Sequence, residues 1–210
     1  MHIVLLGDSS FDNAPYVERG EEVIATLTRR LPEGWRATLN ARDGAVTQQV
    51  QEQLRALPED ATHLVVSVGG NDALGVSGVL QQPARSVAES LDRLAGIREA
   101  FAEDYRAMLA AVLGRKLPVA ISTIYEARFS ELPMRRIGAA ALTVLNDFIT
   151  REASVRGLPV IDLRAMFSED ADYANAIEPS GRGSEKIAAA ILSLVNEHDF
   201  ARGRSTTYVR

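Results

Sequence analysis

The stretch His2-Ile3-Val4-Leu5-Leu6-Gly7-Asp8-Ser9-Ser10 decides the fold of this chain. Its first part, up to Leu6, is mostly apolar and contains β-branched residues, which predicts a buried strand. The strand leads directly into a glycine, an aspartate and a serine, so the Ser9 hydroxyl is expected at its carboxyl end. In an open parallel α/β sheet, ligands bind at that end of the strands. Ser9 is therefore a candidate nucleophile; the alternative is a simple turn with a helix cap.

Four more short apolar runs, each bounded by turn residues, predict further strands, and helical periodicity fills the intervals between them. The strands are predicted at 35–40, 62–68, 117–124 and 158–163. The helices are predicted at 21–31, 47–57, 83–113 and 133–149, and a final helix carries the apolar residues between 187 and 195. Thr47 is the predicted cap of its helix. The long helix has Val87 and Leu91 in its apolar stripe and Gly96 as a candidate break.

This alternation of strands and helices predicts one α/β domain over residues 1–198, with three layers (α/β/α) and right-handed crossovers. We predict a five-stranded parallel sheet in the flavodoxin-like order 2-1-3-4-5, which opens a crevice between the first and third strands. The basic tail, residues 199–210, has no core pattern, and we expect it to be frayed.

The composition limits the possible partners. The chain has 210 residues and a net charge of -5, which disfavours nucleic acid and anionic membranes as partners. It contains no cysteine, which excludes disulfides and thiolate metal sites. No apolar run reaches the length of a membrane span, and a strand that begins at residue 2 leaves no room for a signal peptide. We therefore expect a cytoplasmic protein; its oligomeric state is left open.

Several polar segments follow different predicted strands and should meet at one edge of the sheet. They are Gly7-Asp8-Ser9, Asp43-Gly44, Gly70-Asn71-Asp72 and the loop 172–180. Acyl transfer requires a nucleophilic hydroxyl, a base, and donors directed at the developing oxyanion. Ser9 supplies the hydroxyl, and the three predicted donors are the backbone amides of Ser9 and Gly44 and the side-chain amide of Asn71.

These motifs resemble those of the SGNH (GDSL-type) hydrolases over about residues 1–198. Gly-Asp-Ser, a glycine after the second strand and Gly-x-Asn-Asp after the third correspond here to Gly7-Asp8-Ser9, Gly44 and Gly69-Gly70-Asn71-Asp72. The resemblance implies the SGNH fold. It also implies esterase, lipase, thioesterase or carbohydrate-esterase activity on a small-molecule ester or acyl substrate, without a metal or organic cofactor.

The fourth motif of the family, Asp-x-x-His before the last helix, is different in this chain. Counting back from Pro179, Glu178 occupies the histidine position and Asn175 the aspartate position. A shifted register with Asp172 would place Asn175 in the histidine position. The three histidines, His2, His63 and His198, are expected away from the site, at the rim or surface of the domain.

A glutamate is a weaker base than histidine at neutral pH, because its reference pKa is about 4.3 rather than about 6.5. Burial or a nearby Asp43 or Asp172 would raise the pKa of Glu178. We hypothesise a Ser9–Glu178–Asn175 site, in which Asn175 donates a hydrogen bond that orients Glu178. The rival hypothesis is that Glu178 only caps the last helix and that hydrolysis has been lost.

Other polar residues of the same edge are weaker candidates for substrate contacts. They are Asp8, Asp12, Asn13, Asp43 and Asp72, and the alternative for them is a role in holding turns. Tyr125 and Phe129 follow the fourth strand and are candidates for a pocket wall or for an ordinary surface loop. Two functions remain open: a serine hydrolase with an atypical base, or a non-catalytic protein of the same fold that binds a carboxylate or acyl ligand.

Overall fold

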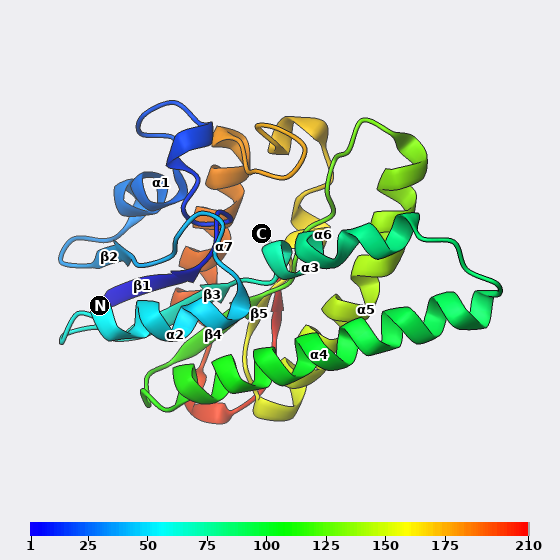
Figure 1. Cartoon of the computed structure of the whole chain (residues 1–210). Coiled ribbons are helices and arrows are strands. Elements are labelled where there is room, and N and C mark those ends of the chain that lie inside the picture. The colour runs from blue at the N-terminus through cyan, green and yellow to red at the C-terminus, as the bar shows by residue number, and fades with distance from the viewer. Residues whose placement is uncertain (210) are drawn as a thin grey trace.

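A parallel sheet forms the centre of the computed structural model, which describes residues 1–209 (Figure 1). Its strand order is β2-β1-β3-β4-β5-β6, and every neighbouring pair is parallel. The strands are β1 (His2–Gly7), β2 (Arg36–Leu39), β3 (His63–Ser67), β4 (Val119–Ser122), β5 (Val160–Ile161) and β6 (Thr207–Tyr208). The predicted fold and the order 2-1-3-4-5 are confirmed, and a sixth strand extends the sheet.

The sixth strand comes from the tail, so the prediction of a frayed C-terminus was wrong for these residues. The backbone amides of Val160 and Asp162 donate hydrogen bonds to the carbonyls of Thr206 and Tyr208, each at 2.8 Å. This pairing satisfies the backbone groups along the free edge of β5. Backbone pairing of two residues leaves almost no apolar pattern in a sequence, which explains why the strand was missed.

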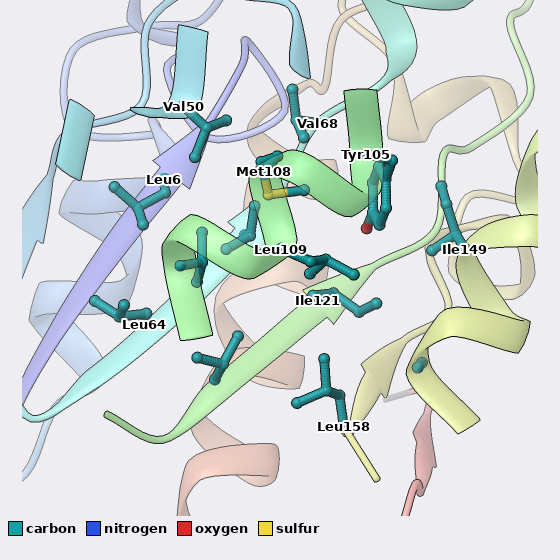
Figure 2. Packing of buried hydrophobic residues seen from close by; sticks show 14 of the residues in the cluster. Leu6, Val50, Leu64, Val68, Tyr105, Met108, Leu109, Ile121, Ile149 and Leu158 are labelled. Atoms are coloured by element: carbon teal, nitrogen blue, oxygen red, sulfur yellow. The ribbon is translucent and has the colours of Figure 1, made fainter. Parts of the chain in front are cut away.

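Helices cover both faces of the sheet, and the strands send alternate side chains to the two faces. On β1, Ile3 and Leu5 pack in the core with α1 and α7, whereas Val4 and Leu6 pack in the core with α2, α4 and α5. Figure 2 shows part of the core that contains Val4 and Leu6, with Leu6 near Met108 of α4. The helices of these layers are α1 (Val23–Arg30), α2 (Val50–Gln53), α4 (Val87–Leu113), α5 (Leu132–Arg156) and α7 (Gly181–Glu197).

Short helical segments complete the chain. They are η1 (Ala14–Tyr16), η2 (Thr47–Gln49), η3 (Leu54–Ala56), α3 (Gly70–Val76), η4 (Ser77–Gln81), α6 (Leu163–Met166), η5 (Asp170–Asp172) and η6 (Phe200–Arg202). Thr47 is the first residue of η2, and Val46 occupies the cap position that was predicted for Thr47.

The first half of α4 differs from the prediction. Val87 is 77% exposed and Leu91 is 60% exposed, and the buried residues of α4 begin only at Phe101. The helix also continues through Gly96 without a break. Figure 1 shows the reason: the first turns of α4 project beyond the strands. An apolar period predicts which face of a helix is apolar, but not whether the sheet reaches that far.

Gly7 fixes the carboxyl end of β1. Its φ is +128°, and a Cβ at this position would lie 1.7 Å from the Ser67 carbonyl oxygen of β3. Gln53 of α2 holds the same residue from the other side: its Oε1 accepts a hydrogen bond from Gly7 N and its Nε2 donates one to Gly7 O, both at 2.7 Å. The backbone immediately before Asp8 and Ser9 is therefore held by two neighbouring elements.

No helix within residues 1–209 is long and apolar enough to cross a membrane.

Candidate active site

Ser9 lies in the first turn after β1, at the floor of a cleft with a volume of about 350 Å³. The turn is closed by hydrogen bonds from the amides of Phe11 and Asp12 to the Asp8 carbonyl, both at 3.1 Å. Ser9 is 7% exposed, and the side chains of Asn71 and Glu178 line the cleft with it. The fold thus brings together three of the predicted site residues, from segments that are far apart in the sequence.

The turn at Gly44 lies beside Asn71. Gly44 has a φ of +75°, and the Asn71 side-chain amide donates a hydrogen bond of 3.0 Å to the carbonyl of Ala45, its neighbour. Within residues 1–209, the backbone amides of Ser9 and Gly44 donate no hydrogen bond. These amides and the second hydrogen of the Asn71 amide are therefore available to an acceptor, which is the property an oxyanion hole requires.

Asp12 and Asp43 were candidates for substrate contacts or for holding turns, and both participate in holding this turn. Asp12 Oδ2 accepts a hydrogen bond of 2.9 Å from the Asp43 amide, and Asp43 Oδ2 accepts one of 2.7 Å from the Tyr16 hydroxyl. Asp43 and Gly44 are both exposed.

Glu178 provides a buried carboxylate beside the serine. Glu178 is only 5% exposed, and its Oε2 atom is buried without a hydrogen-bond partner. Burial raises the pKa of Glu178 and the charge of Asp43 adds to this, whereas the facing Ser9 hydroxyl lowers it. Within the described chain, the two groups form no hydrogen bond of standard geometry; such contacts are often long before a substrate binds.

The loop that carries Glu178 is held at several points. Asp172 is fully buried, and Lys186 Nζ contacts its Oδ2 at 2.7 Å. Its backbone carbonyl accepts a hydrogen bond of 3.0 Å from the Ser180 amide. On the other side of the loop, the Tyr125 hydroxyl donates a hydrogen bond of 2.7 Å to the Ile177 carbonyl. Asp172 is thus a structural anchor of the loop, and Glu178 has little freedom to leave the cleft.

Asn175 is placed differently from the prediction. Its Oδ1 accepts hydrogen bonds from the backbone amides of Ile177 and Glu178, at 2.9 and 3.0 Å. No hydrogen bond within residues 1–209 joins its side-chain amide to the Glu178 carboxylate. Asn175 therefore fixes the backbone of the loop, because a short amide side chain satisfies amides two and three residues further along more readily than it reaches a buried side chain.

Asn13 and Asp72 also serve the fold rather than the cleft. Asn13 is completely buried and its side chain bonds Pro179 O, Ser184 Oγ and Val23 N, at 3.1, 2.8 and 3.0 Å. Asp72 accepts the Thr47 amide at 3.0 Å, and burial raises its pKa. Neither residue lines the cleft.

Asp8 directly precedes Ser9 and also lines the cleft. Burial, with smaller contributions from the charges of Glu178 and Asp72, raises its pKa to about 6, although hydrogen bonds from Ser10 oppose the shift. One of these bonds joins the Ser10 amide to Asp8 Oδ1 at 3.0 Å. Two carboxylates thus flank the candidate nucleophile, and both are costly to ionise in this environment.

Apolar side chains form most of the remaining cleft wall, and the sequence analysis missed nearly all of it. Leu80 of η4, Leu94 of α4, and Phe129 and Leu142 near and on α5 are examples, and each is only half-buried. An apolar residue at helical spacing has the same signature in a core and in a pocket, so the sequence does not separate the two. Phe129 and Tyr125, predicted as candidates for a pocket wall, do line the cleft.

The three histidines lie elsewhere. His2 and His63 begin β1 and β3, at the opposite edge of the sheet, and His198 follows the last residue of α7. His2 is bonded to Asp60 and Thr38, at 3.0 and 2.7 Å. Within residues 1–209, no histidine lines the cleft.

Comparison with known proteins supports the fold and gives the family. Residues 5–186 match the model of the GDSL-like lipase/acylhydrolase family. No curated protein sequence matches the chain. Similar solved structures include a lipolytic G-D-S-L protein from Veillonella parvula (16% identity, TM-score 0.68, 94% of this chain and 100% of that one).

Two further structures have the same fold. An extracellular lipase from Streptomyces rimosus is 19% identical, with a TM-score of 0.66 over 95% of this chain and 100% of that one. The lipase Lip_vut3 from a goat rumen metagenome is 18% identical, with a TM-score of 0.72 over 92% of this chain and 96% of that one. At these identities the likeness is one of fold, whereas the family match covers most of the sequence. The chain belongs to the GDSL-like lipase/acylhydrolase family.

Proposed function

We propose that this protein is a serine hydrolase that cleaves a small ester or acyl group through Ser9, with Glu178 as its general base. The observation that carries the proposal is the buried carboxylate of Glu178, which faces the Ser9 hydroxyl and has an oxygen without a partner. A buried oxygen without a hydrogen-bond partner is energetically unfavourable, so its presence calls for a functional explanation. Accepting a proton from the neighbouring serine is such an explanation.

The proposed reaction has two steps. Glu178 removes the proton of Ser9 as Oγ attacks the carbonyl carbon, and the negative charge on the substrate oxygen is met by the Ser9 and Gly44 amides and the Asn71 side chain. Protonated Glu178 then gives its proton to the leaving oxygen, and an acyl-enzyme remains. Water, deprotonated by the same carboxylate, attacks the acyl-enzyme, and Ser9 recovers its proton when the acid leaves.

The roles of the surrounding residues follow from their contacts. We assign Asn175 to positioning, through the backbone amide of Glu178, in place of the direct hydrogen bond to the carboxylate that the sequence suggested. A neutral amide is sufficient here, because a glutamate base becomes neutral when it accepts a proton and creates no positive charge that needs a partner. Asp8 holds the turn of Ser9 through Ser10.

Two variants test the proposal on short-chain aryl esters between pH 5 and 9. Ser9→Ala should abolish turnover, and Glu178→Gln should lower kcat by roughly 100- to 10,000-fold, the usual contribution of a positioned base. Glu99→Gln, a matched change at an exposed residue of α4, should leave the rate unchanged. The base must be ionised, so the rate should fall on the acid side.

The outcomes separate the two functions that the sequence left open. Ester turnover that is the same in wild-type and Ser9→Ala protein would contradict the proposal and favour a binding protein. Turnover that needs Ser9 but survives Glu178→Gln would remove only the base assignment. The cytoplasmic location and the absence of a nucleic-acid partner remain predictions from the sequence.

A further inference from the structure

Several carboxylates gather around the candidate nucleophile. Asp8 and Glu178 line the cleft together with Ser9, and they are only 2% and 5% exposed. Asp12 and Asp43 belong to the neighbouring turn, where Asp12 Oδ2 accepts the Asp43 amide at 2.9 Å. The charge of Asp43 acts on Glu178, so the two groups of carboxylates are in electrostatic contact. We call these four residues the acidic cluster.

The acidic cluster has no matching basic side chain. Arg135 is the one basic residue among the described residues that line the cleft, and Asp170 Oδ1 already contacts its Nη2 atom at 3.2 Å. Burial raises the pKa of Glu178 and of Asp8, and the neighbouring charges that raise both values further are carboxylates. Oε2 of Glu178 also lacks a hydrogen-bond partner within residues 1–209. The described chain therefore leaves negative charge at this end of the cleft without a counter-ion.

This charge opposes the proposed reaction at the step in which the oxyanion forms. When Glu178 accepts the proton of Ser9 it becomes neutral, and the negative charge moves to the substrate oxygen. A histidine base would become positive at the same moment and would offset the oxyanion. Here the oxyanion forms beside Asp8 with only neutral donors to stabilise it, so an added positive charge would lower the barrier.

We propose that the substrate supplies this charge, and that it is an ester with an ammonium group within a few bonds of the bond that is cleaved, held at the acidic cluster. This inference rests on the proposed function. The half-buried Tyr16 lies beside the cluster, because its hydroxyl donates a hydrogen bond of 2.7 Å to Asp43 Oδ2. Carboxylates with an aromatic ring are a combination that binds ammonium groups, and the exposed Asp43 is accessible to such a group.

Isosteric pairs of esters test the charge directly. Choline butyrate and 3,3-dimethylbutyl butyrate differ by one nitrogen in place of a carbon, on the alcohol side. The p-nitrophenyl esters of 4-(trimethylammonio)butyrate and 5,5-dimethylhexanoate carry the same change on the acyl side. Each kcat/KM is divided by the rate of that ester with hydroxide, which removes differences in intrinsic reactivity. The pair that responds shows whether the ammonium group belongs to the alcohol or to the acid.

We expect the corrected kcat/KM of the charged ester to exceed that of its neutral partner at least about ten-fold at low salt, in one pair or in both. The ratio should fall at least about three-fold between ~20 mM and ~500 mM NaCl, because salt screens the attraction between charges. Asp43→Asn removes one charge of the cluster and keeps an oxygen that accepts the Tyr16 hydrogen bond, and it should lower the ratio at least about three-fold. Asp92→Asn, the same change at an exposed carboxylate of α4, should leave the ratio unchanged.

The pH profile gives a second readout. The titratable side chains that interact electrostatically with Glu178 are Asp8, Asp43, Tyr16 and Tyr125, and none of them carries a positive charge. A bound ammonium group favours the ionised carboxylate and therefore lowers the pKa of Glu178 from its raised value. The acid limb of kcat should lie at lower pH for the charged ester than for its neutral partner.

Calorimetry with Ser9→Ala protein adds a readout that needs no turnover, since the charged ester of the responding pair should bind more tightly than the neutral one. Ser9-dependent turnover with equal corrected rates in both pairs, a ratio that is independent of salt, or an unchanged ratio in Asp43→Asn would overturn the ammonium assignment and leave the hydrolase intact. Tighter binding of a charged ester that is lost in Asp43→Asn, without turnover of any ester, would overturn the hydrolase and support the ammonium assignment. Equal binding without turnover would overturn both.

Discussion

The replacement Asp8→Asn should stabilise the protein at neutral pH, because Asp8 is a fully buried carboxylate that must ionise at a cost. Its pKa is raised from 3.8 to about 6, mainly by burial. A shift of this size corresponds to about 3 kcal/mol, at about 1.36 kcal/mol per pKa unit. Asparagine has nearly the same shape and keeps an oxygen that accepts the hydrogen bond from the Ser10 amide.

The direction of the pH dependence follows from linkage. A group whose pKa is raised on folding stabilises the folded state below its unfolded pKa, and this contribution is lost as the pH rises through the folded pKa. The wild-type protein should therefore lose about 3 kcal/mol of stability between pH 4 and pH 7 through Asp8, and the variant should not. The free-energy difference in favour of Asp8→Asn should grow over this interval and level off above pH 7.

Urea denaturation followed by circular dichroism, at pH values from 4 to 8, measures this difference. Asp92→Asn is the matched control, since Asp92 is an exposed carboxylate of α4, and it should reproduce the wild-type pH dependence. A difference between wild type and Asp8→Asn that is constant across the pH range, or largest in acid, would refute the reasoning. We also expect Asp8→Asn to change the acid limb of the activity profile, since Asp8 and Glu178 interact electrostatically.

Three further substitutions test the parts that hold the site. Gly7→Ala should prevent folding or cost more than about 4 kcal/mol, because its Cβ would overlap the Ser67 carbonyl; a soluble, active variant would contradict this, as judged by yield and circular dichroism. Gln53→Leu leaves the Gly7 N–H without a partner, so it should cost ~1–3 kcal/mol in urea denaturation and lower kcat; unchanged values of both would show that the contact is dispensable. Asp172→Asn weakens the contact with Lys186 beneath the Glu178 loop, and we expect a loss of ~1–3 kcal/mol with a lower kcat, whereas wild-type stability would exclude an anchoring role.

Local sequence signals predicted the strands and the position of Ser9 well, for identifiable reasons. β1 and β3 are buried on both faces, so each is an almost continuous apolar run followed by glycine. The Gly7-Asp8-Ser9 turn follows one such run directly, and parallel pairing then places Ser9 at the ligand-binding edge. β6 lacks this signal, because two residues paired through their backbone at the sheet edge need no apolar pattern.

The roles of the polar side chains were predicted less well. Asn13, Asp12 and Asn175 all carry groups that suit a substrate, yet their oxygens accept hydrogen bonds from nearby backbone amides. In a single sequence, an amide or carboxylate that closes a turn has the same appearance as one that contacts a ligand. Which of the two it does depends on the distances between segments, and these are set only when the loops pack.

The sequence by itself determined the parallel sheet, its order and the position of Ser9 at the end of β1, because apolar period and turn residues act over a few neighbours along the chain. Only the tertiary structure decided that Glu178 is buried against that serine, that Asn175 holds its backbone, and that apolar residues of η4, α4 and α5 border a cleft instead of filling a core. Burial, pKa and open space are properties of how distant segments pack, and no local pattern specifies them.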